Sequence, residues 1–240
     1  MIILGIIPAR GGSKGIPRKN IKPLCGKPLI AYTVESAISS GIFHRIILTT
    51  DSEEIASVGK QFGAEVPFLR PPELAEDNTP TLPVILHTLK WLKEKEGFVP
   101  DHTVILQPTT PLRQGFHLKE AIDLLIKSEA DSVVSVSEVP GHYNPHWQFK
   151  LDLKNRLKIF TGESLQNIVK RRQDLLKTYT RNGAIYAFKT KLLFEATPSF
   201  YGNDVCAYIM EGKYSVNIDS MEDFKMAEIK MAEIKNNKVL

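Results

Sequence analysis

The chain has 240 residues, of which 42% are hydrophobic, and 31 basic against 27 acidic side chains leave a formal net charge of only +4. This length and apolar content support one sizeable core, whereas the weak, scattered positive charge disfavours a nucleic-acid-binding protein. No apolar run approaches the ~20 residues of a membrane-spanning helix. The cysteines, Cys25 and Cys206, are too few for a disulfide framework, so we expect a reducing, cytoplasmic location.

Strand-like and helix-like segments alternate along the first 139 residues. Continuous apolar runs typical of buried strands alternate with segments of helical spacing, bounded by Ser52 as an N-cap and by Gly41 and Gly63 as stop signals. The expected strands are 1–7, 45–51, 103–106 and 132–139, and the expected helices are 27–41, 52–63, 81–97 and 117–130. This order predicts an α/β fold, with an open, mostly parallel, Rossmann-like sheet and helices on both faces.

The alternation stops after Pro140 and resumes near Asn182. Residues 141–163 are aromatic and basic, with a turn-like Lys154-Asn155, and predict a hairpin that leaves the main sheet. We expect residues 140–178 to form a dimerisation and substrate-contact insertion within a single domain spanning 1–240. Two further strands, at 182–189 and 214–219, and an amphipathic helix at 220–235 complete the predicted elements.

A glycine-rich basic loop follows the first strand. Residues 6–20 read IIPARGGSKGIPRKN, and glycines there permit close approach of the backbone to an anion that Arg and Lys neutralise. The order of residues is neither a Walker A loop nor G-x-G-x-x-G, which argues against a dehydrogenase. From the glycines alone, an anion-binding loop and a plain solvated loop both remain open.

Five ordered motifs carry a family resemblance over nearly the whole chain. They are IPARGGSKGIPRKNI with GKPLIAYTVESA, FLRPPELAEDNTPT, LQPTTPLR, RRQDLLKTYTRNGAIY and VNIDSMEDF. Together they resemble the CMP-N-acetylneuraminate synthetase family, whose members activate nine-carbon sialic-type acids. The resemblance implies a nucleotidyltransferase that uses CTP, transfers CMP to the anomeric hydroxyl of a nine-carbon sugar acid and releases pyrophosphate.

The resemblance assigns the first loop to the triphosphate. It implies that Arg10 and Lys19 stabilise the leaving pyrophosphate as catalytic residues, while Arg18 faces solvent. Neutralising charge on the phosphates is the main catalytic requirement of such transfers. The other residues expected to bind the nucleotide here are Ala9, Gly11, Ser13, Lys14 and Asn20.

The next two motifs supply the base and the ribose. Arg70 matches the arginine that reads the cytosine carbonyl, although an ion pair of Arg70 with Glu73 or Asp77 is the alternative. Thr81 matches a hydroxyl residue that touches the nucleotide. Gln107 is expected at the ribose and Thr109 at the sugar, because ligands bind outside the carboxyl ends of strands in open α/β sheets.

The acceptor sugar acid is expected to meet later residues. By the resemblance, Arg172 binds the acid from across a homodimer, and Asn182 and Tyr186 line the sugar pocket. Some sialic-acid members carry an arginine where this chain has Thr180, and here the arginine is shifted by one position to Arg181. The preferred acid therefore stays open among N-acetylneuraminate, legionaminate and pseudaminate types.

A magnesium site is expected near the end of the chain. The family often shows D-x-D in this motif, and here Asn217 replaces the first acid, which leaves Asp219 as the main Mg²⁺ ligand and Asn217 as a neutral one. Asp219 or Ser220 is also a good N-cap for the helix that follows. Both roles are compatible if Ser220 is the cap.

Two other functional classes compete with this interpretation. A related nucleotidyltransferase for another sugar is disfavoured because the G-D-E-P loop of the eight-carbon-acid enzymes is replaced by Pro108-Thr109-Thr110. A non-catalytic nucleotide-binding adaptor is disfavoured because Arg10, Lys19 and Asp219 are all retained.

Overall fold

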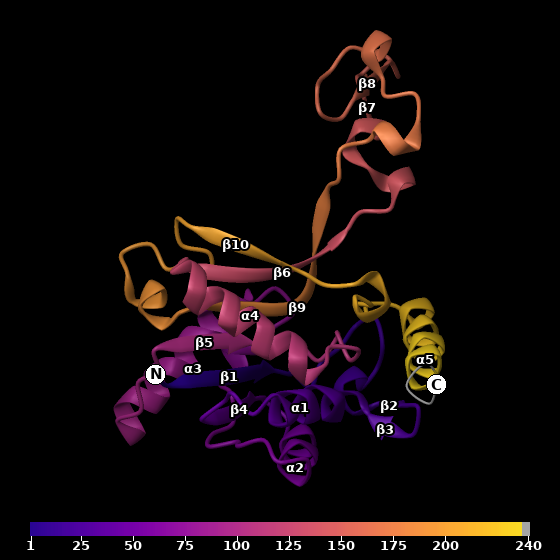
Figure 1. The fold of residues 1–240 in the computed structure, drawn as a ribbon. Helices are drawn as coiled ribbons and strands as arrows, with labels where there is room; N and C mark the ends of the chain where they lie inside the picture. The colour runs from indigo at the N-terminus through magenta and orange to yellow at the C-terminus, as the bar shows by residue number, and fades with distance from the viewer. Residues whose placement is uncertain (237–240) are drawn as a thin grey trace.

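A six-stranded sheet runs through the computed structural model, which describes residues 1–236 (Figure 1). The spatial order is β10-β6-β9-β5-β1-β4. The bounds are β1 (Ile3–Pro8), β4 (Arg45–Thr49), β5 (His102–Ile105), β6 (Ser132–Glu138), β9 (Tyr179–Lys189) and β10 (Val205–Ile209). Only β9 runs antiparallel to its neighbours, so the expected mostly parallel α/β sheet is confirmed.

Within residues 1–236, five α-helices pack around this sheet. They are α1 (Leu29–Ser40), α2 (Glu53–Gln61), α3 (Thr81–Glu96), α4 (Gly115–Ser128) and α5 (Met221–Asn236). Along β1, Ile3 and Ile7 join a core that includes α1, α4 and α5, whereas Leu4 and Ile6 join a second core with α3. Since successive strand residues point to opposite faces, this explains why β1 is apolar throughout.

The local signals in the sequence act as expected at the helix ends. The Ser52 hydroxyl accepts a hydrogen bond of 3.4 Å from the Ile55 N–H and caps α2. Gly41 at φ 66° and Gly97 at φ 63° terminate α1 and α3 in the left-handed conformation.

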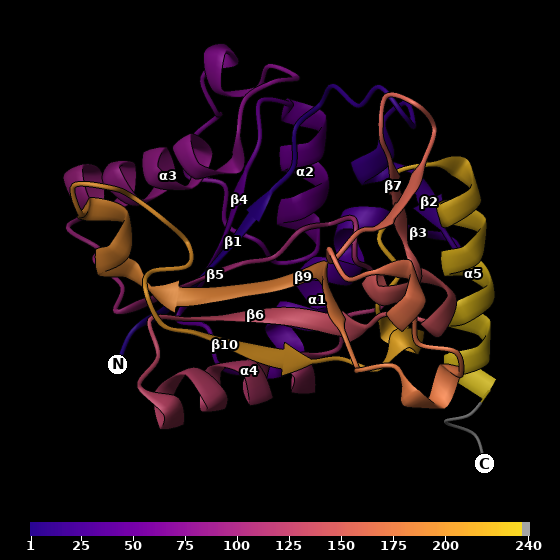
Figure 2. The same ribbon diagram turned by 90° about the horizontal axis from the view of Figure 1, so that it is seen from above.

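The insertion between β6 and β9 rises away from the body of the molecule (Figure 1), and in the view from above it overlaps the body (Figure 2). Its hairpin pairs β7 (Phe149–Leu151) with β8 (Leu157–Ile159), and Asn155 occupies the turn at φ 58°. A smaller hairpin of β2 (Pro23–Leu24) and β3 (Lys27–Pro28) precedes α1. The predicted hairpin that leaves the main sheet is therefore confirmed.

One predicted strand is wrong, and one strand of the main sheet was not predicted, nor were the two short strands β2 and β3. Residues 214–219 form no strand, because the Ile218 side chain is buried in the core and its N–H donates to the Thr109 carbonyl at 2.8 Å. The sixth strand is instead β10, on the edge of the sheet beside β6. Its side chains alternate between exposed and half-buried, and this short edge pattern carries a weak sequence signal.

Within residues 1–236, no helix is both long enough and apolar enough to cross a lipid bilayer. Cys25 is an exposed free thiol, and Cys206 is a half-buried one.

A pronounced bulge interrupts β9 where it passes β6. Val134 pairs with Tyr186 and Val136 with Arg181, so residues 182–185 of β9 lie opposite Ser135. The buried Ser135 hydroxyl donates to the Asn182 Oδ1 at 2.6 Å and accepts from the Ile185 N–H at 2.7 Å. One hydroxyl therefore holds both ends of the bulge.

Replacing Ser135 by alanine is expected to lower the free energy of unfolding by about 1–3 kcal/mol, because the Ile185 N–H and the Asn182 amide lose a buried partner. Urea denaturation of the wild type and the variant measures the change. Ser137→Ala, on the same strand but not fully buried, is the control. Equal losses in both variants would contradict this account of the bulge.

Candidate active site

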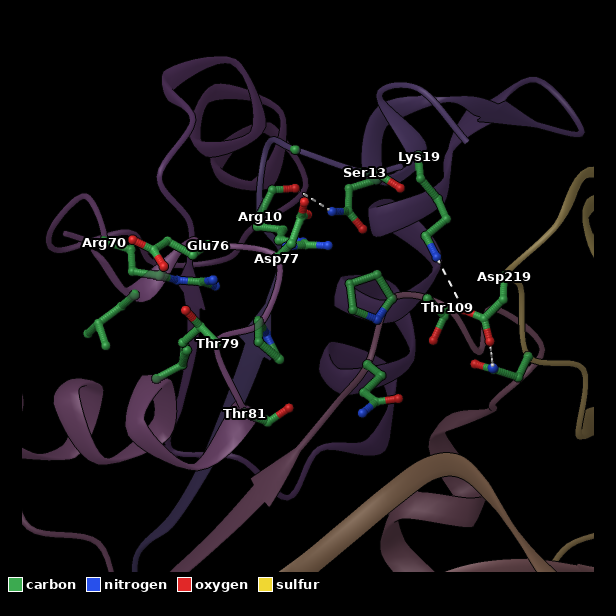
Figure 3. A pocket seen from close by; sticks show the side chains of 18 residues that line it. Arg10, Ser13, Lys19, Arg70, Glu76, Asp77, Thr79, Thr81, Thr109 and Asp219 are labelled. Carbon is green, nitrogen blue, oxygen red and sulfur yellow. Dashed lines mark hydrogen bonds and ion pairs between the residues drawn. The ribbon is translucent and has the colours of Figure 1, made fainter. Parts of the chain in front are cut away.

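A cleft of about 450 Å³ opens at the carboxyl ends of β1, β4 and β5 (Figure 3). Main-chain hydrogen bonds join the segments that follow these strands: the Ala9 N–H donates to the Thr49 carbonyl at 3.0 Å, and the Arg70 N–H to the Thr50 carbonyl at 2.7 Å. In an open α/β sheet this edge is where ligands bind. The structure thus has a cleft at the carboxyl ends of the strands, where the sequence predicted that ligands bind.

The glycine-rich loop is held by its own side chains and neighbours. The Gly11 N–H donates to Asp51 Oδ1 at 2.8 Å, and the buried Asn20 amide donates to the Arg10 carbonyl at 2.9 Å. Ala9 and Gly11 do not line the cleft, and their N–H groups bind Thr49 and Asp51 instead. Gly12, Ser13 and Asn20 line the cleft. One of the backbone N–H groups that the glycines suggested for an anion, that of Gly11, is therefore already paired.

An acidic side chain sits between the cations of this loop. Arg10 Nη1 lies 2.8 Å from Asp77 Oδ1, and both side chains are seen in Figure 3. Lys14 Nζ lies 2.5 Å from Asp77 Oδ2. The hydrogen bond from Lys14 lowers the pKa of the Asp77 carboxyl, so Asp77 is ionised at neutral pH. Arg18, by contrast, pairs with Glu54 on an exposed surface and faces away, as expected.

Lys19 links the start of the chain to its last quarter. Its ammonium donates to the Ile218 carbonyl at 2.8 Å and lies 3.4 Å from Asp219 Oδ1. The Asn217 amide donates to Asp219 Oδ2 at 2.5 Å. A Cβ at Gly15 would meet the Asp219 carbonyl oxygen at 2.6 Å, which explains glycine at this close approach.

The cap of α5 is made by Ser220, which leaves the Asp219 side chain available to the cleft. The Asp223 N–H donates to Ser220 Oγ at 3.2 Å, and Asp223 Oδ2 accepts from the Ser220 N–H at 2.8 Å. This reciprocal pair is a capping box. The sequence left the cap open between Asp219 and Ser220, and Ser220 takes it.

Arg70 is buried at the opposite end of the cleft from Lys19 and Asp219 (Figure 3). Its guanidinium donates to the Thr49 carbonyl and to the Thr49 hydroxyl. Burial lowers the pKa of Arg70 to about 10. The alternative of an ion pair with Glu73 or Asp77 is wrong, because Asp77 pairs with Arg10 and Lys14 and the Arg70 fork is engaged by Thr49.

A second hollow of about 440 Å³ adjoins the cleft and shares Thr81, Gln107 and Asn217 with it. Asn182 and Tyr186 line this hollow from the β9 bulge, whereas Thr109 lines the cleft itself. The Asn182 amide also donates to Ser215 Oγ at 3.0 Å. The structure therefore brings these predicted sugar residues beside the predicted nucleotide residues.

Arg172 lies apart from both hollows. It belongs to the insertion, where its side chain packs against Gly141 at the foot of the hairpin. Within one protomer it contributes nothing to the cleft. Its predicted role across a dimer stays a prediction.

Sequence reasoning missed a buried arginine behind the Gln107 loop. Arg113 is 1% exposed, and its Nη1 donates to the Ala184 carbonyl at 2.7 Å and the Thr110 hydroxyl at 3.0 Å. Burial lowers its pKa to about 9. The final R of LQPTTPLR is the signal that was available, and its function is to fasten residues 107–113 to β9.

A divalent cation would find few ligands here. Residues 1–236 contain no cluster of three or more acidic, His or Cys side chains suited to a metal. Asp219 and Asn217 offer one carboxylate and one amide at the cleft. This donor set fits a Mg²⁺ ion that keeps several waters and shares phosphate oxygens, and it does not fit a metal held by protein ligands alone.

Comparison with known proteins decides the family. The cytidylyltransferase family model matches residues 4–233. The chain belongs to the cytidylyltransferase family. The pseudaminic acid cytidylyltransferase of Campylobacter jejuni strain 81-176 is 34% identical over 226 residues, which make up 94% of each chain. The CMP-N,N'-diacetyllegionaminic acid synthase of Legionella pneumophila strain Philadelphia 1 is 34% identical over 238 residues, or 95% of each chain.

Other cytidylyltransferases extend the comparison. The N-acylneuraminate cytidylyltransferase of Escherichia coli O18:K1:H7 is 36% identical over 225 residues, which cover 94% of this chain and 51% of that protein. A solved structure of CMP:2-keto-3-deoxy-manno-octonic acid synthetase complexed with CTP superposes with a TM-score of 0.71 at 14% identity, covering 97% of this chain and 99% of that one. The family resemblance noted in the sequence is therefore confirmed.

Asp77→Asn is expected to tighten the binding of pyrophosphate by up to about fivefold, because Arg10 and Lys14 lose an anionic competitor on a partly exposed surface. Isothermal titration calorimetry with pyrophosphate measures this change. Glu76→Gln, from the same cleft wall, is the matched control. Weaker binding by Asp77→Asn would mean that Asp77 assists the anion instead of competing with it.

Proposed function

We propose that this cytidylyltransferase transfers CMP from CTP to the anomeric hydroxyl of a nine-carbon sugar acid. The hydroxyl oxygen forms a bond to the α-phosphorus, the bond from that phosphorus to the bridging oxygen breaks, and pyrophosphate leaves. The hydroxyl proton is released to solvent or to a basic group. One nucleotide sugar and one pyrophosphate therefore form from one CTP and one acid.

A single observation carries this proposal. One cleft holds a buried arginine at one end and a set of cations with the carboxylates of Asp77 and Asp219 at the other, and a hollow lined mostly by amides and hydroxyls opens beside it. The end with the buried arginine suits a base, the cationic end suits a triphosphate, and the hollow suits a sugar. It is the arrangement that positions a nucleotide and an acceptor for in-line displacement.

The basic end of the cleft suits the triphosphate. Arg10 and Lys19 provide charge where the pyrophosphate develops it, and Ser13 adds a donor. Lys14 does not line the cleft and is exposed beside it, paired with Asp77. Lys19 is held by the Ile218 carbonyl, so its ammonium is oriented before the substrate arrives. Preorganised donors of this kind lower the barrier without reorganising during the reaction.

The buried end suits the cytosine base. Arg70 is fixed by Thr49 and presents a guanidinium that donates to a base carbonyl. Uracil carries the same carbonyl, so selection of cytosine also needs backbone acceptors for its exocyclic amine. Thr81 and Gln107 lie between this end and the hollow, where we place the ribose.

Mg²⁺ is the proposed metal, with Asp219 as its charged ligand and Asn217 as a neutral one. When bound, the ion supplies positive charge to phosphate oxygens. Asp219 also lies beside Lys19, so the carboxylate limits the repulsion between this lysine and an incoming cation.

We propose a homodimer in which the insertion supplies the contact. The hairpin exposes large apolar side chains, among them Leu151, Leu153, Leu157 and Phe160. A monomer rarely leaves such a group of side chains in water. A partner would also bring Arg172 to a neighbouring site. The free thiols of Cys25 and Cys206 support a cytoplasmic reaction.

The nature of the acid is proposed only as a nine-carbon ulosonic acid. Relatives named for pseudaminic, legionaminic and N-acylneuraminic acids are 34%, 34% and 36% identical to this chain. These nearly equal identities do not favour any one of the three acids. Pyrophosphate release from CTP with a panel of the three acids ranks them.

The first expected outcome concerns the nucleotide. CTP should bind at least tenfold more tightly than UTP in the presence of Mg²⁺, because acceptors for the cytosine amine are left unpaired by uracil. Calorimetric titration of both nucleotides tests this. Equal affinities would contradict the cytidylyltransferase reaction, and Arg70→Lys should weaken both nucleotides.

The second expected outcome concerns the metal. Asp219→Ala should nearly abolish activity, Asn217→Ala should be milder because water replaces a neutral ligand, and Asn217→Asp should lower the Mg²⁺ concentration needed. Initial rates across a Mg²⁺ titration compare the three. Equal damage in Asp219→Ala and Asn217→Ala would place the ligand elsewhere.

The third expected outcome concerns the oligomer. Analytical ultracentrifugation at micromolar protein should give a dimer, and Leu157→Asp should shift it toward monomer with loss of activity, since burying a charge at an interface is costly. Mixing Arg172→Ala chains with Arg10→Ala chains should restore part of the activity. A fully active monomer would exclude the shared site.

A further inference from the structure

Arg181 is the one charged side chain among the described residues that line the hollow beside the cleft. The rest of the lining consists of hydroxyl and amide groups, with the Gly183 backbone. Arg181 forms no ion pair with a carboxylate within residues 1–236. A cation in a polar hollow with no counter-charge indicates that the ligand brings a negative group.

Two phenols flank the exposed Arg181 side chain. The interaction with Tyr201 is the main reason that the pKa of Arg181 is raised, and Tyr186 contributes less. Tyr186 comes from the same strand, and Tyr201 from the segment between β9 and β10. An arginine with neighbours on two sides has less side-chain entropy to lose when it binds an anion.

The bulge in β9 decides where this arginine lies. Arg181 pairs with Val136 just before the bulge, and Gly183 within it has φ 75°. A Cβ at Gly183 would lie 3.1 Å from Gln107 Oε1, so the bulge passes directly against the Gln107 loop. Arg181 is therefore anchored next to the boundary between the hollow and the nucleotide cleft.

We infer that Arg181, from the same chain as the cleft, binds the carboxylate of the sugar acid. A guanidinium recognises a carboxylate through two parallel hydrogen bonds. In a ulosonic acid the carboxylate is attached to the anomeric carbon, which also carries the attacking hydroxyl. Arg181 therefore orients the nucleophile, and Arg172 of a dimer is left to contact a more distant part of the acid.

This inference rests on the proposed function, and its test compares the acid with its methyl ester. For wild-type protein, kcat/KM for the free acid should be about 10- to 100-fold above that for the ester. This ratio corresponds to the free energy that a hydrogen bond between charged groups contributes. In Arg181→Gln this ratio should fall close to one. Arg181→Lys should give an intermediate ratio because it keeps charge without the fork.

Further variants separate Arg181 from its neighbours. Tyr201→Phe should raise KM for the acid severalfold with little change in kcat, and Arg171→Gln, an exposed arginine paired with Asp174, should change neither constant. CTP affinity by calorimetry should stay within about twofold in Arg181→Gln, which reports a folded nucleotide site.

The inference is overturned if Arg181→Gln keeps the wild-type ratio of acid to ester. It is also overturned if Arg172→Gln, and not Arg181→Gln, removes that ratio. Failure of the proposed function looks different: wild-type protein would release no pyrophosphate from CTP with any nine-carbon acid of the panel.

Discussion

The geometry of the site depends on parallel strands that end at one edge of the sheet. β1, β4 and β5 all deliver their following segments to this edge, and main-chain hydrogen bonds fasten those segments to one another. The Ile218 N–H adds a bond to the Thr109 carbonyl, so the C-terminal part of the chain is tied to the same edge. These backbone contacts fix the segments that carry the side chains of the cleft.

Local patterns were sufficient for most of the fold. The apolar run of β1, the Ser52 cap and the Gly41 stop each act through neighbours a few residues away, so sequence alone identified them. The failure at 214–219 has the opposite cause. Val216 and Ile218 alternate as in a strand, but Ile218 is buried in the core and bonded to the Gln107 loop, and Val216 is only partly buried. The edge position of the sheet is occupied by β10 instead.

The sequence predicted which residues belong to the site better than it predicted which partners those residues contact. Motifs brought Arg10, Lys19, Arg70 and Asp219 to attention, and these four line one cleft. The partners were not predictable, because Asp77 meets Arg10 only through a loop 67 residues away in sequence and Arg113 meets β9 only through the folded sheet. Contacts of this kind depend on the path of the chain and leave no local pattern.

Buried cations recur around the cleft without buried carboxylates. Arg70 and Arg113 are both nearly inaccessible, and each is satisfied in part by backbone carbonyls and threonine hydroxyls. Such an arrangement costs stability, since desolvation disfavours the charged form. It also leaves this region of the protein positive, which favours a polyanionic ligand such as a nucleoside triphosphate.

The bond from Lys19 to the Ile218 carbonyl has a consequence for the growing chain. The glycine-rich loop forms one side of the cleft. Residues 217–219, which bind Lys19 and complete another side, are synthesised much later. A ribosome adds about 5–20 residues each second, so the N-terminal loop spends roughly ten seconds or more without its partner. During that interval Lys19 lacks the carbonyl and the carboxylate that hold it, whereas Arg10 and Lys14 can already pair with Asp77, and Arg18 with Glu54. The part of the loop that carries Lys19 is therefore the last to reach its final arrangement.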